Sequence, residues 1–170
     1  MDKILNKSNK VILRDTEIND LDFVIKAERE EENAQYVGQW SKEQHINSLS
    51  NKDILHIIIE EAKSNKPIGY LILAGKENIN NNLEFRRIVI CEKNKGYGKE
   101  SLRLVKELAF EKLNAHRLWL DVRLKNKKAQ NVYKSEGFKE EGILRECVLY
   151  KNEYESLIVM SILEDEYLKI

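Results

Sequence analysis

The 170-residue chain is poor in several features that mark particular protein classes. It has only two cysteines, Cys91 and Cys147, which are too few for a disulfide framework and suit a reducing cytosol. Its 29 basic and 29 acidic residues cancel, so no net charge draws it to nucleic acid or to an anionic membrane. No apolar run approaches the roughly 20 residues of a membrane span, and residues 1–7 hold no signal-peptide apolar stretch. These absences predict a soluble cytoplasmic protein with no nucleic-acid and no membrane partner.

Proline is scarcer still, because Pro67 is the only one in the chain. The sequence also has no internal repeat, low-complexity tract or linker-like segment that would divide it. A chain of this length can bury a proper hydrophobic core on its own. We therefore expect a single domain over residues 1–170.

Hydrophobic spacing predicts a mixture of strands and helices along the chain. The predicted strands are 11–14, 54–60, 67–73, 84–90, 117–122, 138–150 and 153–163, and the predicted helices are 19–28, 42–49, 98–114 and 126–136. Asn19 and Ser41 are expected to cap the first two helices, because their side chains can accept hydrogen bonds from free N–H groups. The acidic run 28–32 is interpreted as a solvated helix end, with a surface facing a cationic acceptor as the alternative.

A glycine turn, Lys93-Asn94-Lys95-Gly96-Tyr97-Gly98, lies between the strand at 84–90 and the long helix after it. Such a turn presents backbone N–H groups to a phosphate, and the helix dipole adds to the attraction. The turn matches only part of the dinucleotide fingerprint and lacks the Walker Gly-Lys-Ser/Thr. Taken alone it is typical of a plain loop, and an enzyme that binds NAD or ATP remains an alternative.

A second block follows about 30 residues later: Asn126-x-x-Ala129-x-x-x-Tyr133-x-x-x-Gly137-Phe138. With the glycine turn, it resembles the GNAT N-acetyltransferase superfamily, and most of all its ribosomal-protein-alanine and spermidine acetyltransferases. The resemblance covers nearly all of the chain. It implies the α/β GNAT fold, with a mixed, mostly antiparallel sheet of about seven strands flanked by about four helices.

The resemblance also implies an activity. The chain would move an acetyl group from acetyl-CoA to a primary amine by direct attack in a ternary complex, with no metal. The acceptor would be a polyamine or other small amine, or a protein N-terminus, and a homodimer is one assembly we allow for. The alternative within this fold is a module that binds CoA without catalysis.

Site residues are carried over from the family by position. Lys93 stands where the family has glutamine or arginine, which keeps a long polar donor but loses a planar fork. The residues implied in cofactor binding are Ile88, Val89, Ile90, Lys93, Lys95, Gly96, Tyr97, Gly98, Lys99, Asn126 and Tyr133. For the residues at 88–90 the expectation concerns backbone groups that pair with the pantetheine arm, and for the turn it concerns N–H groups.

Tyr133 and Glu84 are the implied catalytic residues. The Tyr133 hydroxyl would donate a proton to the leaving thiolate, and Glu84 would take the amine proton through water. Even spacing would place Glu84, Arg86 and the residues at 88 and 90 on one face of a regular strand. Two alternatives are a surface Glu84 paired with Arg86, and ordered water as the base. His45, His56 and His116 lack ligand spacing, and His56 is expected to be a satisfied core or edge residue.

Overall fold

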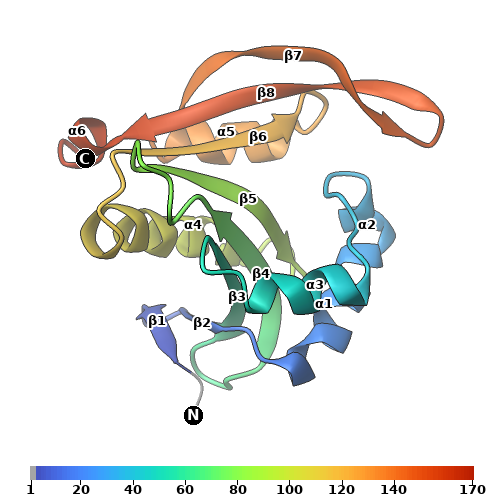
Figure 1. Ribbon diagram of the computed structural model, residues 1–170, viewed down its shortest axis with the longest axis vertical. Coiled ribbons are helices and arrows are strands. Elements are labelled where there is room, and N and C mark those ends of the chain that lie inside the picture. The colour runs from blue at the N-terminus through green and yellow to red at the C-terminus, as the bar shows by residue number, and fades with distance from the viewer. Residues whose placement is uncertain (1–2) are drawn as a thin grey trace.

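A computed structural model describes residues 3–170, and in it one eight-stranded sheet carries helices on both faces (Figure 1). The strands are β1 Ile4–Lys7, β2 Val11–Asp15, β3 Ile54–Glu61, β4 Pro67–Ala74, β5 Asn82–Ile90, β6 Arg117–Arg123, β7 Lys139–Tyr150 and β8 Glu153–Leu163. Their order in the sheet is β1-β2-β3-β4-β5-β6-β8-β7, and every neighbouring pair is antiparallel except β5 and β6. The predicted mixed, mostly antiparallel sheet is confirmed, and β1 is the strand that the prediction missed.

The helices are α1 Leu21–Arg29, α2 Glu31–Ala34, α3 Lys42–Leu49, α4 Tyr97–Glu107, α5 Lys127–Ser135 and α6 Glu164–Tyr167. A π-helical turn, Leu108–Lys112, continues α4, and a 3-10 turn, Ile18–Asp20, precedes α1. The expected cap at Asn19 is wrong, because Glu17 and Asp20 form a reciprocal capping box around the 3-10 turn and Asn19 lies inside it. Within residues 3–170, no helix is long and apolar enough to cross a membrane.

Other predicted boundaries are confirmed by their local hydrogen bonds and backbone angles. The Ser41 hydroxyl accepts a hydrogen bond from the Gln44 N–H at 3.2 Å, which starts α3. Gly137 ends α5 with a φ of 94°, which an L side chain rarely adopts. Lys151 and Asn152 have φ values of 47° and 63° and form the tight turn of the β7–β8 hairpin, which arches over the rest of the sheet (Figure 1).

The sheet separates two hydrophobic clusters. The larger cluster packs α4, α5 and alternate sheet residues such as Leu71 and Leu118. The smaller one packs α1 and the chain before α3 against the opposite face, around Val24, Ile58 and Tyr70. The helices at 97–112 and 127–135 therefore lie on one face, and the helices at 21–49 lie on the other.

A β-bulge in β5 changes which residues share a face. Ile72 pairs with Arg87 while Leu73 pairs with Phe85, so Arg86 is an extra residue on β5. Phe85 lies in the larger cluster with Ile88, an even-numbered residue, and regular alternation would not allow this. The expectation that Glu84 shares a face with the residues at 88 and 90 is therefore wrong.

β5 and β6 separate soon after they meet. Their parallel pairing covers only three residue pairs, from Asn82↔Arg117 to Glu84↔Trp119. Beyond Glu84, β6 continues to pair with β8 on its other side and β5 continues to pair with β4. The sheet is therefore open between the second halves of β5 and β6.

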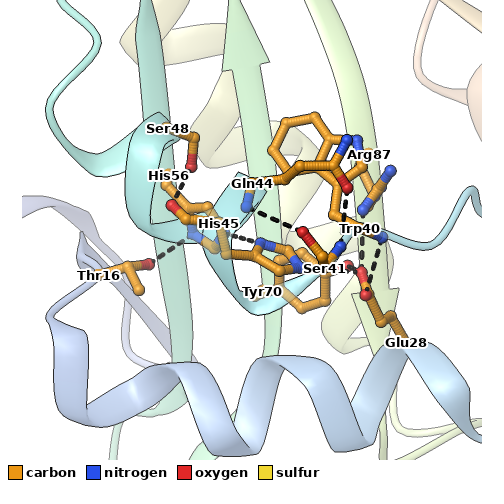
Figure 2. A network of polar contacts seen from close by, with 10 residues as sticks. All are labelled: Thr16, Glu28, Trp40, Ser41, Gln44, His45, Ser48, His56, Tyr70 and Arg87. Atoms are coloured by element: carbon orange, nitrogen blue, oxygen red, sulfur yellow. Dashed lines mark hydrogen bonds and ion pairs between the residues drawn. The ribbon is translucent and has the colours of Figure 1, made fainter.

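Glu28 corrects the interpretation of the acidic run as a solvated helix end. Its side chain is fully buried and accepts hydrogen bonds from Tyr70 Oη at 2.8 Å and Arg87 Nη1 at 2.9 Å (Figure 2). His45 Nε2 lies 3.2 Å away, and the Trp40 N–H donates at 3.1 Å. Burial opposes ionisation, but these hydrogen bonds outweigh it and hold the pKa of Glu28 below its ordinary value. Only the later residues of the run, 29–32, are exposed.

Candidate active site

The opening between β5 and β6 contains a cleft of about 720 Å³. Its walls come from both faces of the sheet: Tyr36 and Arg87 on the α1–α3 side, and Leu102 and Tyr133 on the α4–α5 side. Among the residues implied as site residues, the cleft is lined by Ile88, Ile90, Lys93, Gly98, Lys99, Asn126 and Tyr133. Val89, Lys95, Gly96, Tyr97 and Glu84 are not among its lining residues.

Backbone groups of β5 face the cleft at alternate residues. The Cys91 N–H donates to the carbonyl of Ile68, which lies in β4, at 2.8 Å. Because backbone groups alternate in an antiparallel ladder, those of Val89 also point toward β4. The N–H and C=O groups of Ile88 and Ile90 therefore point into the open side, where a ligand can extend the sheet. The Val89 side chain packs in the smaller cluster and its backbone groups point toward β4, so neither faces the cleft.

The glycine turn presents unused N–H groups at the start of α4. Gly96 has a φ of 76° and caps the helix, and its carbonyl accepts from the Glu100 N–H. Among the described residues, no hydrogen bond to a protein acceptor is found for the N–H groups of residues 96–99, which lie at the N-terminus of α4. Such a set favours a phosphate. Gly98 lines the cleft. The Tyr97 hydroxyl instead donates a hydrogen bond to Glu61 at 2.6 Å and so stabilises the fold.

Three lysines surround the cleft near this turn. Lys93 donates to Asn33 Oδ1 at 2.5 Å, and burial lowers its pKa. Lys99 is half-exposed beside Glu136, and Lys128 on α5 donates to Asn94 Oδ1 at 2.8 Å. Lys95 points outward to Glu92. The cleft therefore has cationic side chains at the end that holds the free N–H groups.

Tyr133 projects from α5 into the cleft with its ring packed and its hydroxyl free. Its ring contacts Phe85 edge-on and also Phe138, with centroids 6.5 and 5.8 Å away. The Asn126 side chain caps this helix by accepting from the Ala129 N–H at 3.1 Å, which fixes where Tyr133 points. Among residues 3–170, no group is hydrogen-bonded to the Tyr133 hydroxyl. Burial raises the pKa of Tyr133, and the charge of Asp121 raises it further, so the hydroxyl is protonated at neutral pH.

Asp121 is a candidate that the sequence analysis missed. It lies on β6, on the opposite face from its buried neighbours Leu120 and Val122, and lines the cleft opposite Tyr133. No described residue donates a hydrogen bond to its carboxylate, which is open to the cleft. Its poor solvation raises the pKa of Asp121, and the charge of Glu84 raises it further. The sequence did hold one signal for Asp121. It is an acidic residue between core residues of a predicted strand, 12 residues before Tyr133.

Glu84 is paired with a neighbour instead of facing the cleft. Its carboxylate accepts from Arg86 Nη2 at 2.7 Å and Nε at 3.1 Å. Its effect on the cleft is electrostatic, because its charge raises the pKa of Asp121. The described residues include no cluster of metal-binding side chains.

A buried polar network supports the cleft wall formed by Arg87. Figure 2 shows the guanidinium between Glu28 and the Trp40 ring, whose centroid lies 4.7 Å away. The network continues through His45 Nδ1 to His56 Nε2 at 3.0 Å, and from His56 Nδ1 to the Thr16 hydroxyl at 2.9 Å. The expectation that His56 is a satisfied core residue is confirmed.

A family model described as Acetyltransferase (GNAT) domain matches residues 10–139. Spermidine N(1)-acetyltransferase of Vibrio cholerae is 28% identical over 172 residues, which cover 95% of this chain and 97% of that protein. The Escherichia coli K12 protein of the same description is 25% identical, covering 95% of this chain and 90% of its own length.

Solved structures agree with these sequence matches. A crystal structure of the Vibrio cholerae spermidine N-acetyltransferase in complex with CoA and spermine has a TM-score of 0.86 and 25% identity, covering 95% of this chain and 99% of that one. A dodecameric structure of the same enzyme in an intermediate state has a TM-score of 0.81 and 26% identity, covering 95% and 98%.

Proposed function

The chain belongs to the GNAT acetyltransferase family, and from that premise we propose that its cleft transfers an acetyl group from acetyl-CoA to a primary amine of a polyamine. One observation carries this proposal. The opening between β5 and β6 brings the free backbone groups of Ile88 and Ile90, the N–H groups of the glycine turn and the Tyr133 hydroxyl to a single cleft. In a cosubstrate with a pyrophosphate, an extended amide arm and a terminal thioester, the glycine turn suits the pyrophosphate, the backbone groups suit the arm, and the hydroxyl suits the thioester.

The geometry of the cleft supports the binding roles that we propose. The N–H groups at 96–99 would hold the pyrophosphate, with Lys99 and Lys128 adding charge. Backbone groups of Ile88 and Ile90 would pair with the pantetheine amides as an added strand. The residue positions also separate the two substrates, because the glycine turn and Tyr133 lie on the α4–α5 side of the sheet. The acceptor would enter from the α1–α3 side, past Tyr36.

Three hydrogens matter for catalysis: the proton that the amine loses, the N–H that orients the carbonyl oxygen, and the proton that the thiolate gains. When bound, acetyl-CoA supplies the thioester carbonyl that the amine attacks. We assign acceptance of the amine proton to Asp121, because its carboxylate is free in the cleft and its raised pKa brings it nearer to that of a working base. The Ile88 N–H would orient the carbonyl oxygen. Tyr133 would donate its proton to the departing thiolate. Glu84 acts on this centre through the pKa of Asp121.

The acceptor class rests on the relatives and on charge. The similar proteins are described as spermidine acetyltransferases, and one is solved with spermine. Exposed carboxylates of Glu31 and Glu32 lie on α2 beside the cleft, which suits a polycation. A protein N-terminus is the second acceptor we would test. We also propose a cytoplasmic location and an assembly of more than one copy, following the dodecameric relative.

Calorimetric titration with acetyl-CoA, NAD and ATP, followed by turnover with spermidine, tests the proposal. The variant Gly98→Asp places a carboxylate in the phosphate end of the cleft, where a Cβ would meet only Ile90 Cγ1 at 3.7 Å, so folding is spared. We expect acetyl-CoA binding to fall more than about 100-fold through like-charge repulsion. Gly142→Asp is the matched control, because a Cβ there meets nothing within 4 Å. Normal acetyl-CoA binding by a folded Gly98→Asp protein would contradict the site, and tight NAD or ATP binding would contradict the function.

A further inference from the structure

Lys125 has an unusual environment for a surface lysine. It follows β6, and its ammonium lies 5.9 Å from the ring centroid of Tyr36 and 5.4 Å from that of Tyr150. The same ammonium forms an ion pair with the Glu155 carboxylate. These three partners come from the chain after α2, from the end of β7 and from the start of β8. An alkylammonium group is therefore seated among two aromatic rings and a carboxylate.

The carboxylate of this seat is less exposed than the lysine that occupies it. The Glu155 side chain is 14% exposed and is also paired with Arg123 Nη1 at 3.2 Å, whereas the Lys125 side chain is 43% exposed. Tyr36 and Arg123 both line the cleft that contains Tyr133. The seat therefore adjoins the cleft through Tyr36, and the Lys125 side chain is open to solvent on its other side.

The seat has the chemistry of a cation subsite. Aromatic rings attract ammonium groups through the negative potential of their faces, and a carboxylate adds direct charge attraction. Lys125 presents an ammonium on a four-carbon stem, which is the same chemical unit as an aminobutyl arm. A polyamine that offers one amine to the reaction carries a further ammonium three or four carbons away.

We propose that Tyr36, Tyr150 and Glu155 form a subsite for the second ammonium group of a polyamine, and that Lys125 is a tethered competitor for this subsite. The inference rests on the proposed function and names the feature that selects polyamines over monoamines. Binding of a polyamine exchanges one ammonium for another, so the Glu155 charge stays paired throughout. Lys151, which lies 5.5 Å from the Tyr150 centroid and pairs with the exposed Glu31, is the other cation at this rim.

Steady-state kinetics with spermidine and n-butylamine test this inference. The measured quantity is the ratio of the KM for n-butylamine to the KM for spermidine. Lys125→Met empties the subsite, so we expect this ratio to rise about 3- to 10-fold, the range for a cation–aromatic contact with an exposed ion pair. Adding Tyr150→Leu to Lys125→Met should reverse about half of the gain, because one ring of the seat is lost.

Lys127→Met is the matched control, because it removes the same charge from an exposed position two residues away, at the start of α5, and should leave the ratio within twofold. An unchanged ratio in Lys125→Met, or an equal rise in Lys127→Met, would overturn the subsite. If no variant acetylates either amine, the proposed function has failed instead. In that case calorimetry of spermidine binding decides the subsite separately: tighter binding to Lys125→Met supports it, and equal affinity overturns it.

Discussion

The polar groups around Glu28 and those around Tyr133 border the same cleft and differ in how fully they are hydrogen-bonded. Glu28 accepts from Tyr70, Arg87, the Trp40 N–H and His45. Tyr133 and Asp121 have no hydrogen-bond partner in residues 3–170. Buried polar groups in proteins are nearly always paired, as Glu28 is, whereas Tyr133 is half-buried and Asp121 is exposed, so water or a ligand can reach both. The comparison suggests that the first set holds the cleft wall and that the second set is reserved for a ligand.

The largest effect expected from this contrast is on stability. Glu28→Ala leaves Arg87 buried without its carboxylate and removes the acceptor of Tyr70. Removing one partner of a buried ion pair costs about 3–5 kcal/mol, so urea denaturation should show a loss of that size. Tyr133→Phe, which removes an unpaired hydroxyl, should change the free energy of unfolding by less than about 1 kcal/mol. Equal stabilities for the two variants would remove the distinction.

Turnover should show the opposite pattern at Tyr133. Tyr133→Phe keeps the ring contacts with Phe85 and Phe138 and loses only the proton donor. We expect kcat to fall by about 10² while the Kd of acetyl-CoA stays nearly constant. The chemical step should be measured by stopped flow, because slow product release can hide a change in its rate. A chemical step at the wild-type rate would place Tyr133 among the purely structural residues.

The buried network should also make stability depend on pH. Burial lowers the pKa of His56 to about 3, and the charges of His45 and Arg87 act in the same direction. In the unfolded chain a histidine titrates near 6.5, so the unfolded state binds more protons between about pH 3 and about pH 6.5. Stability is therefore lost as pH falls through this window, at up to about 1.4 kcal/mol per pH unit. His56→Gln should flatten the slope of unfolding free energy, whereas His116→Gln, at an exposed site, should not.

The smallest expected effects separate the two carboxylates near the reaction. Asp121→Asn should lower kcat/KM about tenfold or more at neutral pH, and progressively less at alkaline pH, because a base is needed only while the acceptor arrives protonated. Glu84→Gln loses an exposed pair with Arg86, worth under about 1 kcal/mol of stability, and should lower the pKa governing the acidic limb of the rate profile. The reverse pattern, with a large pH-dependent loss only in Glu84→Gln, would return the base to Glu84.

Local sequence patterns predicted most of the fold, because caps and turns are determined by neighbouring residues. Ser41, Asn126 and Gly137 each act within a few residues, and each helix or strand boundary they mark is confirmed. The β5 bulge could not be predicted in this way, because it arises from pairing with β4, and it moved Glu84 to the face opposite Ile88. The burial of Glu28 could have been predicted only weakly. The one indication is that Leu21, Val24 and residue 28 lie at helical spacing on one face.

The three-residue pairing of β5 with β6 divides the sheet into a five-stranded part and a three-stranded part. The β-ladder between these parts ends at Glu84, and no strand among residues 3–170 continues it. A bound pantetheine arm that pairs with Ile88 and Ile90 would continue the hydrogen bonding along β5, as a ninth strand made of cosubstrate. The amide hydrogens of these two residues would then exchange slowly only in the loaded protein. The cosubstrate would therefore stabilise the arrangement of the two parts of the sheet, in addition to its role as acetyl donor.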